Sequence, residues 1–158
     1  MHAVLVFGCV SAPLCPCIGL LDKVKVPHKI AEELRRTFNI PQDYDVGFYS
    51  SKVARLDRWT SVHVGDAVLL RRSGGGRAGG SLHRLLHVED MQLHVTFQCA
   101  VVEEWASIEE TPRWSSWHMT SRTYRFCNLE ELECSVVWSN AVRGEGQAVL
   151  LDPRPHMH

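Results

Sequence analysis

The sequence predicts a mainly β protein, a small and strongly bent β-barrel that follows a short N-terminal helix. Short runs of β-branched and aliphatic residues recur at regular spacing after residue 60, which is typical of β-barrels and β-sandwiches. The 158 residues are enough for one sizeable core and too few for a second full domain. We therefore expect an N-terminal extension with one short helix (residues 1–41), a β-barrel domain (42–152) and a short tail (153–158).

The N-terminal part predicts one strand and one helix. Residues 3–10 form an apolar run that two prolines end, which indicates a buried strand. In residues 29–38, Ile30, Leu34 and Phe38 recur every four residues with charged residues between them, so this segment predicts an amphipathic helix.

The next elements are strands. Gly65-Asp66 supplies a turn that leads into a strand over residues 64–72, and the glycine-rich residues 73–80 indicate a flexible hairpin tip. No Lys-Ser/Thr pair ends this tract, so it is not a phosphate-binding loop. Alternation over residues 82–88 places Leu82, Arg84, Leu86 and Val88 on one face and His83, Leu85 and His87 on the other.

The second half continues this pattern. Further strands are expected at residues 93–102, 118–126, 134–138 and 148–151, with an irregular acidic loop at residues 105–114 and a short turn at 129–132.

Charge and cysteine usage limit the function classes. The formal net charge of −1 gives no overall electrostatic basis for non-specific nucleic-acid binding. The N-terminal apolar stretch has no preceding Lys or Arg and is broken by prolines, so it lacks the pattern of a secretory signal peptide. No apolar run reaches the roughly 18 residues of a membrane span. We expect an intracellular protein whose six cysteines are reduced and which has no membrane partner.

Three segments in order resemble the bromo-adjacent homology (BAH) domain. They are the Gly-Asp turn and strand of residues 64–70, the strand of residues 82–90 that ends in Glu-Asp, and residues 124–137, where an Asn-Leu-Glu turn precedes Cys-Ser-Val. The resemblance covers about residues 57–152 and implies a divergent BAH-like barrel in a nuclear, chromatin-associated and transposon-derived protein. The family's Trp-Phe-Tyr-Arg-Pro strand end is reduced here to Trp105, so none of the family's binding residues is carried over.

Aromatic and acidic residues gather between residues 105 and 124. Tryptophan and tyrosine rings beside carboxylates can hold a lysine or methylated ammonium group. The sequence therefore predicts a non-enzymatic module, without a cofactor, that binds a basic protein tail such as a histone tail. The same rings could instead fill the core. The candidate residues are Trp105, Glu109, Glu110, Trp114, Trp117 and Tyr124.

Two alternatives remain open. The run Val64-Gly65-Asp66-Ala67-Val68-Leu69-Leu70-Arg71 is similar to one in the SH3-like barrels of retroelement integrases. In that interpretation Arg71, Arg72, Arg77 and Arg84 contact nucleic-acid phosphates. The other alternative is a metalloenzyme in which His83, His87 and His94 bind the metal.

Overall fold

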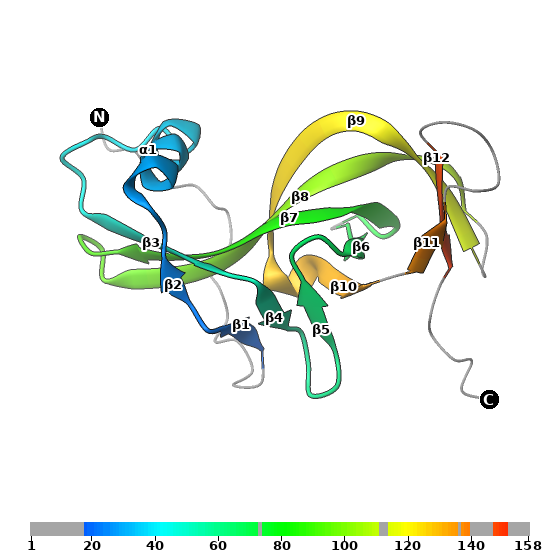
Figure 1. The fold of residues 1–158 in the computed structure, drawn as a ribbon, viewed down its shortest axis with the longest axis horizontal. Helices are drawn as coiled ribbons and strands as arrows, with labels where there is room; N and C mark the ends of the chain where they lie inside the picture. The colour runs from blue at the N-terminus through cyan, green and yellow to red at the C-terminus, as the bar shows by residue number, and fades with distance from the viewer. Residues whose placement is uncertain (1–17, 73, 111–113, 136, 140–146, 152–158) are drawn as a thin grey trace.

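Strands make up most of the chain (Figure 1). The computed structural model describes residues 18–72, 74–110, 114–135, 137–139 and 147–151, with side chains for residues 18–72, 74–105 and 123–135. The elements in chain order are β1 (Gly19–Leu21), β2 (Val24–Lys25), α1 (His28–Thr37), β3 (Val46–Ser51), β4 (Val53–Arg55), β5 (Ser61–His63), β6 (Ala67–Arg71), β7 (Arg77–Asp90), β8 (Val95–Glu110), β9 (Trp114–Asn128), the 3-10 helix η1 (Leu129–Glu131), β10 (Leu132–Ser135), β11 (Val137–Ser139) and β12 (Gln147–Leu151). The predicted mainly β class is confirmed. The strand expected at residues 3–10 lies outside the described residues.

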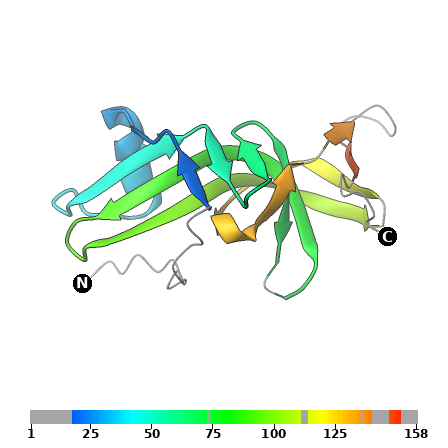
Figure 2. The ribbon, with the colours of Figure 1, turned by 90° about the horizontal axis from the view of Figure 1, so that it is seen from below.

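One large antiparallel sheet dominates the structure. Its strand order is β10-β6-β7-β8-β9-β12-β11, and β3, which pairs with β2, joins it through β7. A separate sheet has the order β1-β4-β5. In Figure 1, β8 and β9 arch over the rest of the large sheet, and the view from below in Figure 2 shows β3, β7 and β8 running side by side.

The large sheet does not close into a barrel within the described residues, so that part of the prediction is wrong. The reason lies in β7. The first residues of this strand pair with β6, and its last six residues pair on the same edge with β3. The sheet therefore branches along β7 instead of curling back on itself.

A β-bulge at His83 changes which residues of β7 share a face. The pairing with β8 runs from Leu82 opposite Val102 directly to Arg84 opposite Val101, which leaves His83 as an extra residue. Leu82 and Leu85 consequently belong to the same core cluster, although they are three residues apart. The predicted alternation holds from Arg84 to Val88, but Leu82 lies on the opposite face from the one predicted, so the prediction fails across the bulge.

Two cores cover the two faces of the sheet. The first core lies between the large sheet, the small sheet and η1, and the second lies between the large sheet and α1. Members of the first core include Val62, Leu70, Leu82, Leu85, Ala100, Val102, Cys127 and Leu129; those of the second include Val26, Leu34, Ile40, Phe48, Leu86, Val88, Cys99 and Val101. The central parts of β7 and β8, around residues 85–88 and 99–102, are thus buried on both faces, which explains their apolar runs.

The predicted helix is confirmed as α1. Leu34 is buried, and Ile30 and Phe38 pack beside it against the second core. Pro27 precedes the helix, and Asn39 ends it with a φ of +53°. The helix therefore shares a core with the sheet.

The predicted turn at Gly65-Asp66 is also confirmed, but the strand that follows it begins at Ala67 and not at residue 64. Gly65 has a φ of +98°, and Asp66 accepts a hydrogen bond from the backbone N–H of His63 through Oδ2 (2.8 Å). Residues 67–70 are all buried.

The glycine-rich tract is only partly a hairpin tip. The turn covers Gly74–Gly76, whereas Ala78, Gly79 and Gly80 are buried within β7. A Cβ atom on Gly80 would lie 2.5 Å from both the carbonyl oxygen of Glu103 and Cγ1 of Val102. Glycine is therefore required at this position because β7 and β8 approach closely, and the prediction of a flexible tip over residues 77–80 is wrong.

Where the structure describes the segment expected as an irregular acidic loop, at residues 105–110 and 114, it is strand, so the prediction of a loop there is wrong. β8 continues to Glu110 and β9 begins at Trp114, with Glu110 opposite Ser115 and Glu109 opposite Ser116. Pairing with β9 thus overrides the low strand propensity of glutamate. No helix in the described part of the chain is long and apolar enough to cross a membrane.

Candidate protein-interaction surface

The structure separates the predicted aromatic and acidic residues into three groups. Trp105 lies in β8 and is 3% exposed, so its indole is part of the interior and cannot contact an external ligand. Tyr124 lies in β9 and is 52% exposed. For Glu109, Glu110, Trp114 and Trp117 the structure describes the backbone in β8 and β9, and their side chains lie outside the described part.

Backbone pairing still places these four residues in one region. Ser107 of β8 pairs with Trp117 of β9, and Glu109 pairs with Ser116, the residue beside Trp117. On its other edge β9 pairs with β12, with Ala148 opposite Trp117. The two glutamates and two tryptophans therefore share the far end of the β8–β9 hairpin.

Tyr124 belongs to a small surface group nearer the centre of the sheet. Its ring centroid lies 5.2 Å from that of His83, with the two planes inclined by 54°. Glu103 of β8 is directly opposite Tyr124 across the strand pair, where side chains come within contact range. We call Tyr124, His83 and Glu103 the Tyr124 surface.

The bulge in β7 creates this surface. A regular strand would direct His83 and Arg84 to opposite faces, whereas in a bulge two consecutive residues oppose a single partner. Arg84 forms an ion pair with Glu33 of α1 (3.8 Å), so it lies on the sheet face that α1 covers. The sequence contains no turn residue at this point, so the bulge could not be predicted.

The arginines of the nucleic-acid alternative are mostly engaged with glutamates. Arg72 pairs with Glu104, Arg77 with Glu133 at 3.3 Å, and Arg84 with Glu33 at 3.8 Å. The alternative requires these guanidinium groups to contact phosphates, which would mean exchanging their carboxylate partners. Arg71, the fourth, is exposed at the end of β6.

Glu104 also belongs to a wider ion-pair network. Arg125 of β9 lies 3.7 Å from Glu104 and 2.6 Å from Glu131 of η1. The other carboxylate oxygen of Glu131 accepts a hydrogen bond from the backbone N–H of Asn128 (2.7 Å). This bond is part of the capping box at the start of η1. These contacts link Arg72, the residue after β6, with β8, β9 and η1, and they give the charged residues a structural role.

The histidines of the metal alternative do not meet. His83 packs against Tyr124, and His94 is exposed in the turn between β7 and β8 with a φ of +54°. His87 is buried and faces Tyr49, at 5.8 Å between ring centroids. The described residues contain no group of three side chains that could hold a metal ion.

His87 instead takes part in a buried polar cluster. Its Nε2 lies 3.2 Å from Oε1 of Glu89, and its Nδ1 lies 3.3 Å from Nε2 of Gln98. Gln98 also accepts the backbone N–H of Leu20 (3.2 Å), which ties β1 to β8. Burial, and then the positive charge of Lys23, lower the pKa of His87 below 6.5, so the imidazole is neutral at physiological pH.

Cys99 and Cys127 are core residues. Burial raises the pKa of each thiol to about 12, so neither is a thiolate available for nucleophilic chemistry. Cys134 is half-buried at the end of β10. The three N-terminal cysteines lie outside the described residues.

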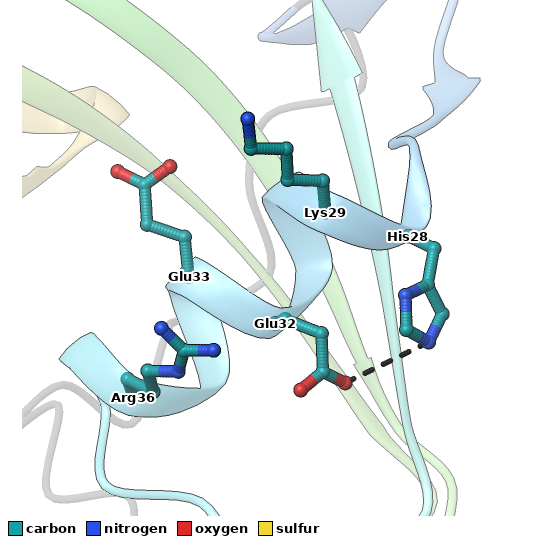
Figure 3. Close-up of a pocket in the computed structure, with 5 residues that line it drawn as sticks. All are labelled: His28, Lys29, Glu32, Glu33 and Arg36. Carbon is teal, nitrogen blue, oxygen red and sulfur yellow. Dashed lines mark ion pairs between the residues drawn. The ribbon is translucent and has the colours of Figure 1, made fainter.

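A hollow beside α1 is lined by both acidic and basic side chains, so it does not favour a ligand of either charge (Figure 3). It is lined by His28, Lys29, Glu32, Glu33 and Arg36, and His28 pairs with Glu32 at 3.8 Å. Acidic and basic groups balance there, and such pairs are typical of a solvated helix face. The hollow is therefore a poor candidate for a charged ligand.

One exposed aromatic residue was missed at the sequence level. Trp59 stands in the turn between β4 and β5 and is 85% exposed, more than any other large hydrophobic residue in the described part of the chain. The preceding Asp57-Arg58 is a turn signal, which is the sequence feature that could have placed Trp59 in an exposed turn.

No protein-family model, curated protein or solved structure with which the chain was compared matches it.

Proposed function

We propose that the chain is a non-enzymatic interaction module that binds basic protein tails at the Tyr124 surface. The observation that carries the proposal is a half-exposed tyrosine ring directly opposite a glutamate on the paired strands β8 and β9. An aromatic face attracts an ammonium or guanidinium group, and a nearby carboxylate adds Coulombic attraction. The backbone positions of Trp114, Trp117, Glu109 and Glu110 extend the candidate surface along the same two strands.

The resemblance to BAH domains favours a chromatin protein as the partner. A histone tail supplies closely spaced lysines and arginines without a fold of its own, so it could follow the β8–β9 pair. A nuclear location of the protein is part of this proposal. The glutamate partners of three of the four arginines weigh against the nucleic-acid alternative at that site.

The proposal can be tested with peptides of equal length that differ in charge or in lysine methylation. Fluorescence anisotropy would compare a lysine-rich tail peptide, its trimethyl-lysine form and an acidic peptide of equal length. We expect both basic peptides to bind and the acidic peptide not to bind.

Variants of the Tyr124 surface provide the decisive comparison. Replacement Tyr124→Ala should weaken binding about 5- to 30-fold, because a partly desolvated cation–π contact is worth roughly 1–2 kcal/mol. Tyr124→Phe should keep most of the affinity, and Glu103→Gln should reduce the salt dependence. Trp59→Ala is the matched control, an exposed aromatic residue elsewhere on the chain. Equal losses in Tyr124→Ala and Trp59→Ala, or no binding of either basic peptide, would rule the proposal out.

A further inference from the structure

The turn between β4 and β5 presents Trp59 to solvent at the tip of a projecting hairpin. Figure 1 shows this hairpin extending below the large sheet. Most of the indole is accessible, since the residue is 85% exposed. Tryptophan side chains are usually largely buried in folded proteins, so a tryptophan that is almost fully exposed calls for a functional explanation.

Hydrogen bonds hold this turn in one conformation. Asp57 accepts the backbone N–H groups of Trp59 (2.6 Å) and Thr60 (2.7 Å) through Oδ1. Leu56 donates its backbone N–H to the carbonyl of Thr60 at 2.8 Å. The exposed ring is therefore pre-positioned, which lowers the conformational entropy lost when a ligand binds.

The hairpin is cationic around this ring. The Arg58 guanidinium lies 5.0 Å from the Trp59 ring centroid, and Arg55 and Lys52 are exposed on the same hairpin. The single carboxylate of the turn, Asp57, is occupied by backbone donors, which hold its pKa below the ordinary value of 3.8. The tip therefore presents positive charge and one aromatic face, in a chain whose net charge is −1.

We propose that this tip is a contact site for single-stranded nucleic acid. An unstacked base lies on the open face of Trp59, and Arg58 and Arg55 contact the phosphates beside it. A duplex would keep its bases stacked away from the ring.

Other anionic partners would contact only part of this tip. An acidic peptide would pair with the arginines and leave the indole without a matching surface. An anionic membrane would bury Trp59, but the neighbouring Asp57, Thr60 and Ser61 are polar and give no apolar area to insert.

The test is fluorescence anisotropy of the whole chain with labelled oligo-U and oligo-dT of about 12 nucleotides, within the site sizes of single-strand binders. Binding should weaken as salt is raised, with a log–log slope of about −1.4 for two phosphate contacts. Trp59→Ala should weaken binding roughly 5- to 100-fold, since one base–aromatic stack is lost.

Three variants separate stacking from other effects. Trp59→Phe keeps a ring and should retain most of the affinity, whereas Trp59→Leu keeps only apolar area and should resemble Trp59→Ala. Arg55→Gln should lower the salt slope by about 0.7. Leu93→Ala is the control, because Leu93 is 65% exposed in a different turn.

Each alternative result overturns the proposal. Equal binding of Trp59→Ala and the unmodified chain would show that the oligonucleotide binds elsewhere. Trp59-dependent binding to phosphatidylserine vesicles or to poly-glutamate, without binding to either oligonucleotide, would assign the tip to a membrane or an acidic protein. By contrast, the expected loss of oligonucleotide binding in Trp59→Ala, with binding of the basic tail peptide unchanged, distinguishes this site from the Tyr124 surface.

Discussion

Replacement of Gly80 by alanine should strongly destabilise the fold. The added Cβ would lie 2.5 Å from the carbonyl oxygen of Glu103 and 2.5 Å from Cγ1 of Val102. Unstrained contacts need about 3.5–4.0 Å between carbon atoms, so the contact with Val102 is too short by about 1.0–1.5 Å. One obstacle is backbone of the paired strand and the other is a fully buried side chain, so neither can move away easily.

The cost follows from this geometry. Overpacking of a core usually costs about 1–3 kcal/mol, and the rigid surroundings place this change near the upper value of about 3 kcal/mol. For a chain of this size that corresponds to a fall in Tm of roughly 6–12 °C. Urea unfolding followed by circular dichroism would measure the free energy, and a thermal scan would measure Tm.

Gly74 provides the matched control for this prediction. A Cβ there would meet nothing within 4 Å, so Gly74→Ala should change the free energy of unfolding by less than about 1 kcal/mol. Similar stabilities for the two variants would refute the close approach of β7 to β8 at Gly80. They would support the flexible tip that the sequence had suggested.

Three further predictions concern buried polar and sulfur-containing groups. Asp90→Ala should reduce the free energy of unfolding by about 2–3 kcal/mol in urea, because the buried carboxylate accepts the Tyr44 hydroxyl (2.7 Å) and two backbone N–H groups of the next turn; a loss below about 0.5 kcal/mol would contradict this. The pKa of His87 is lower in the folded chain than in the unfolded chain, so the unfolded chain binds the proton more tightly. The free energy of unfolding should therefore fall as the pH drops below about 6.5. His87→Gln should flatten that dependence in urea titrations at several pH values. Cys99 and Cys127, with pKa values of about 12, should resist iodoacetamide at pH near 8 until the chain unfolds, as peptide mass spectrometry would show.

Local patterns were sufficient to predict most elements. The four-residue spacing of Ile30, Leu34 and Phe38 identified α1, and Gly65-Asp66 identified the turn before β6. These signals act within a few residues of the chain, where backbone preference and side-chain periodicity decide the structure. The acidic stretch after Trp105 misled the prediction because glutamate disfavours strands by itself, and pairing with β9 outweighs that preference.

The candidate sites could be predicted only in part, for a related reason. Aromatic composition indicated Tyr124, but it could not distinguish this exposed ring from the buried Trp105, since exposure depends on which strands pack above each face. Trp59 is conspicuous only because the β4–β5 hairpin projects from the sheet.

The sequence by itself determined the β-rich class, the amphipathic helix and the main turns, because each depends on neighbouring residues. Tertiary structure alone decided that the sheet remains open, that a bulge at His83 reverses the faces of β7, and that most of the suggested phosphate-binding arginines are paired with glutamates. These outcomes depend on contacts between residues far apart in the chain. Register and closure are set by the fit of whole strands against one another, which no local pattern encodes.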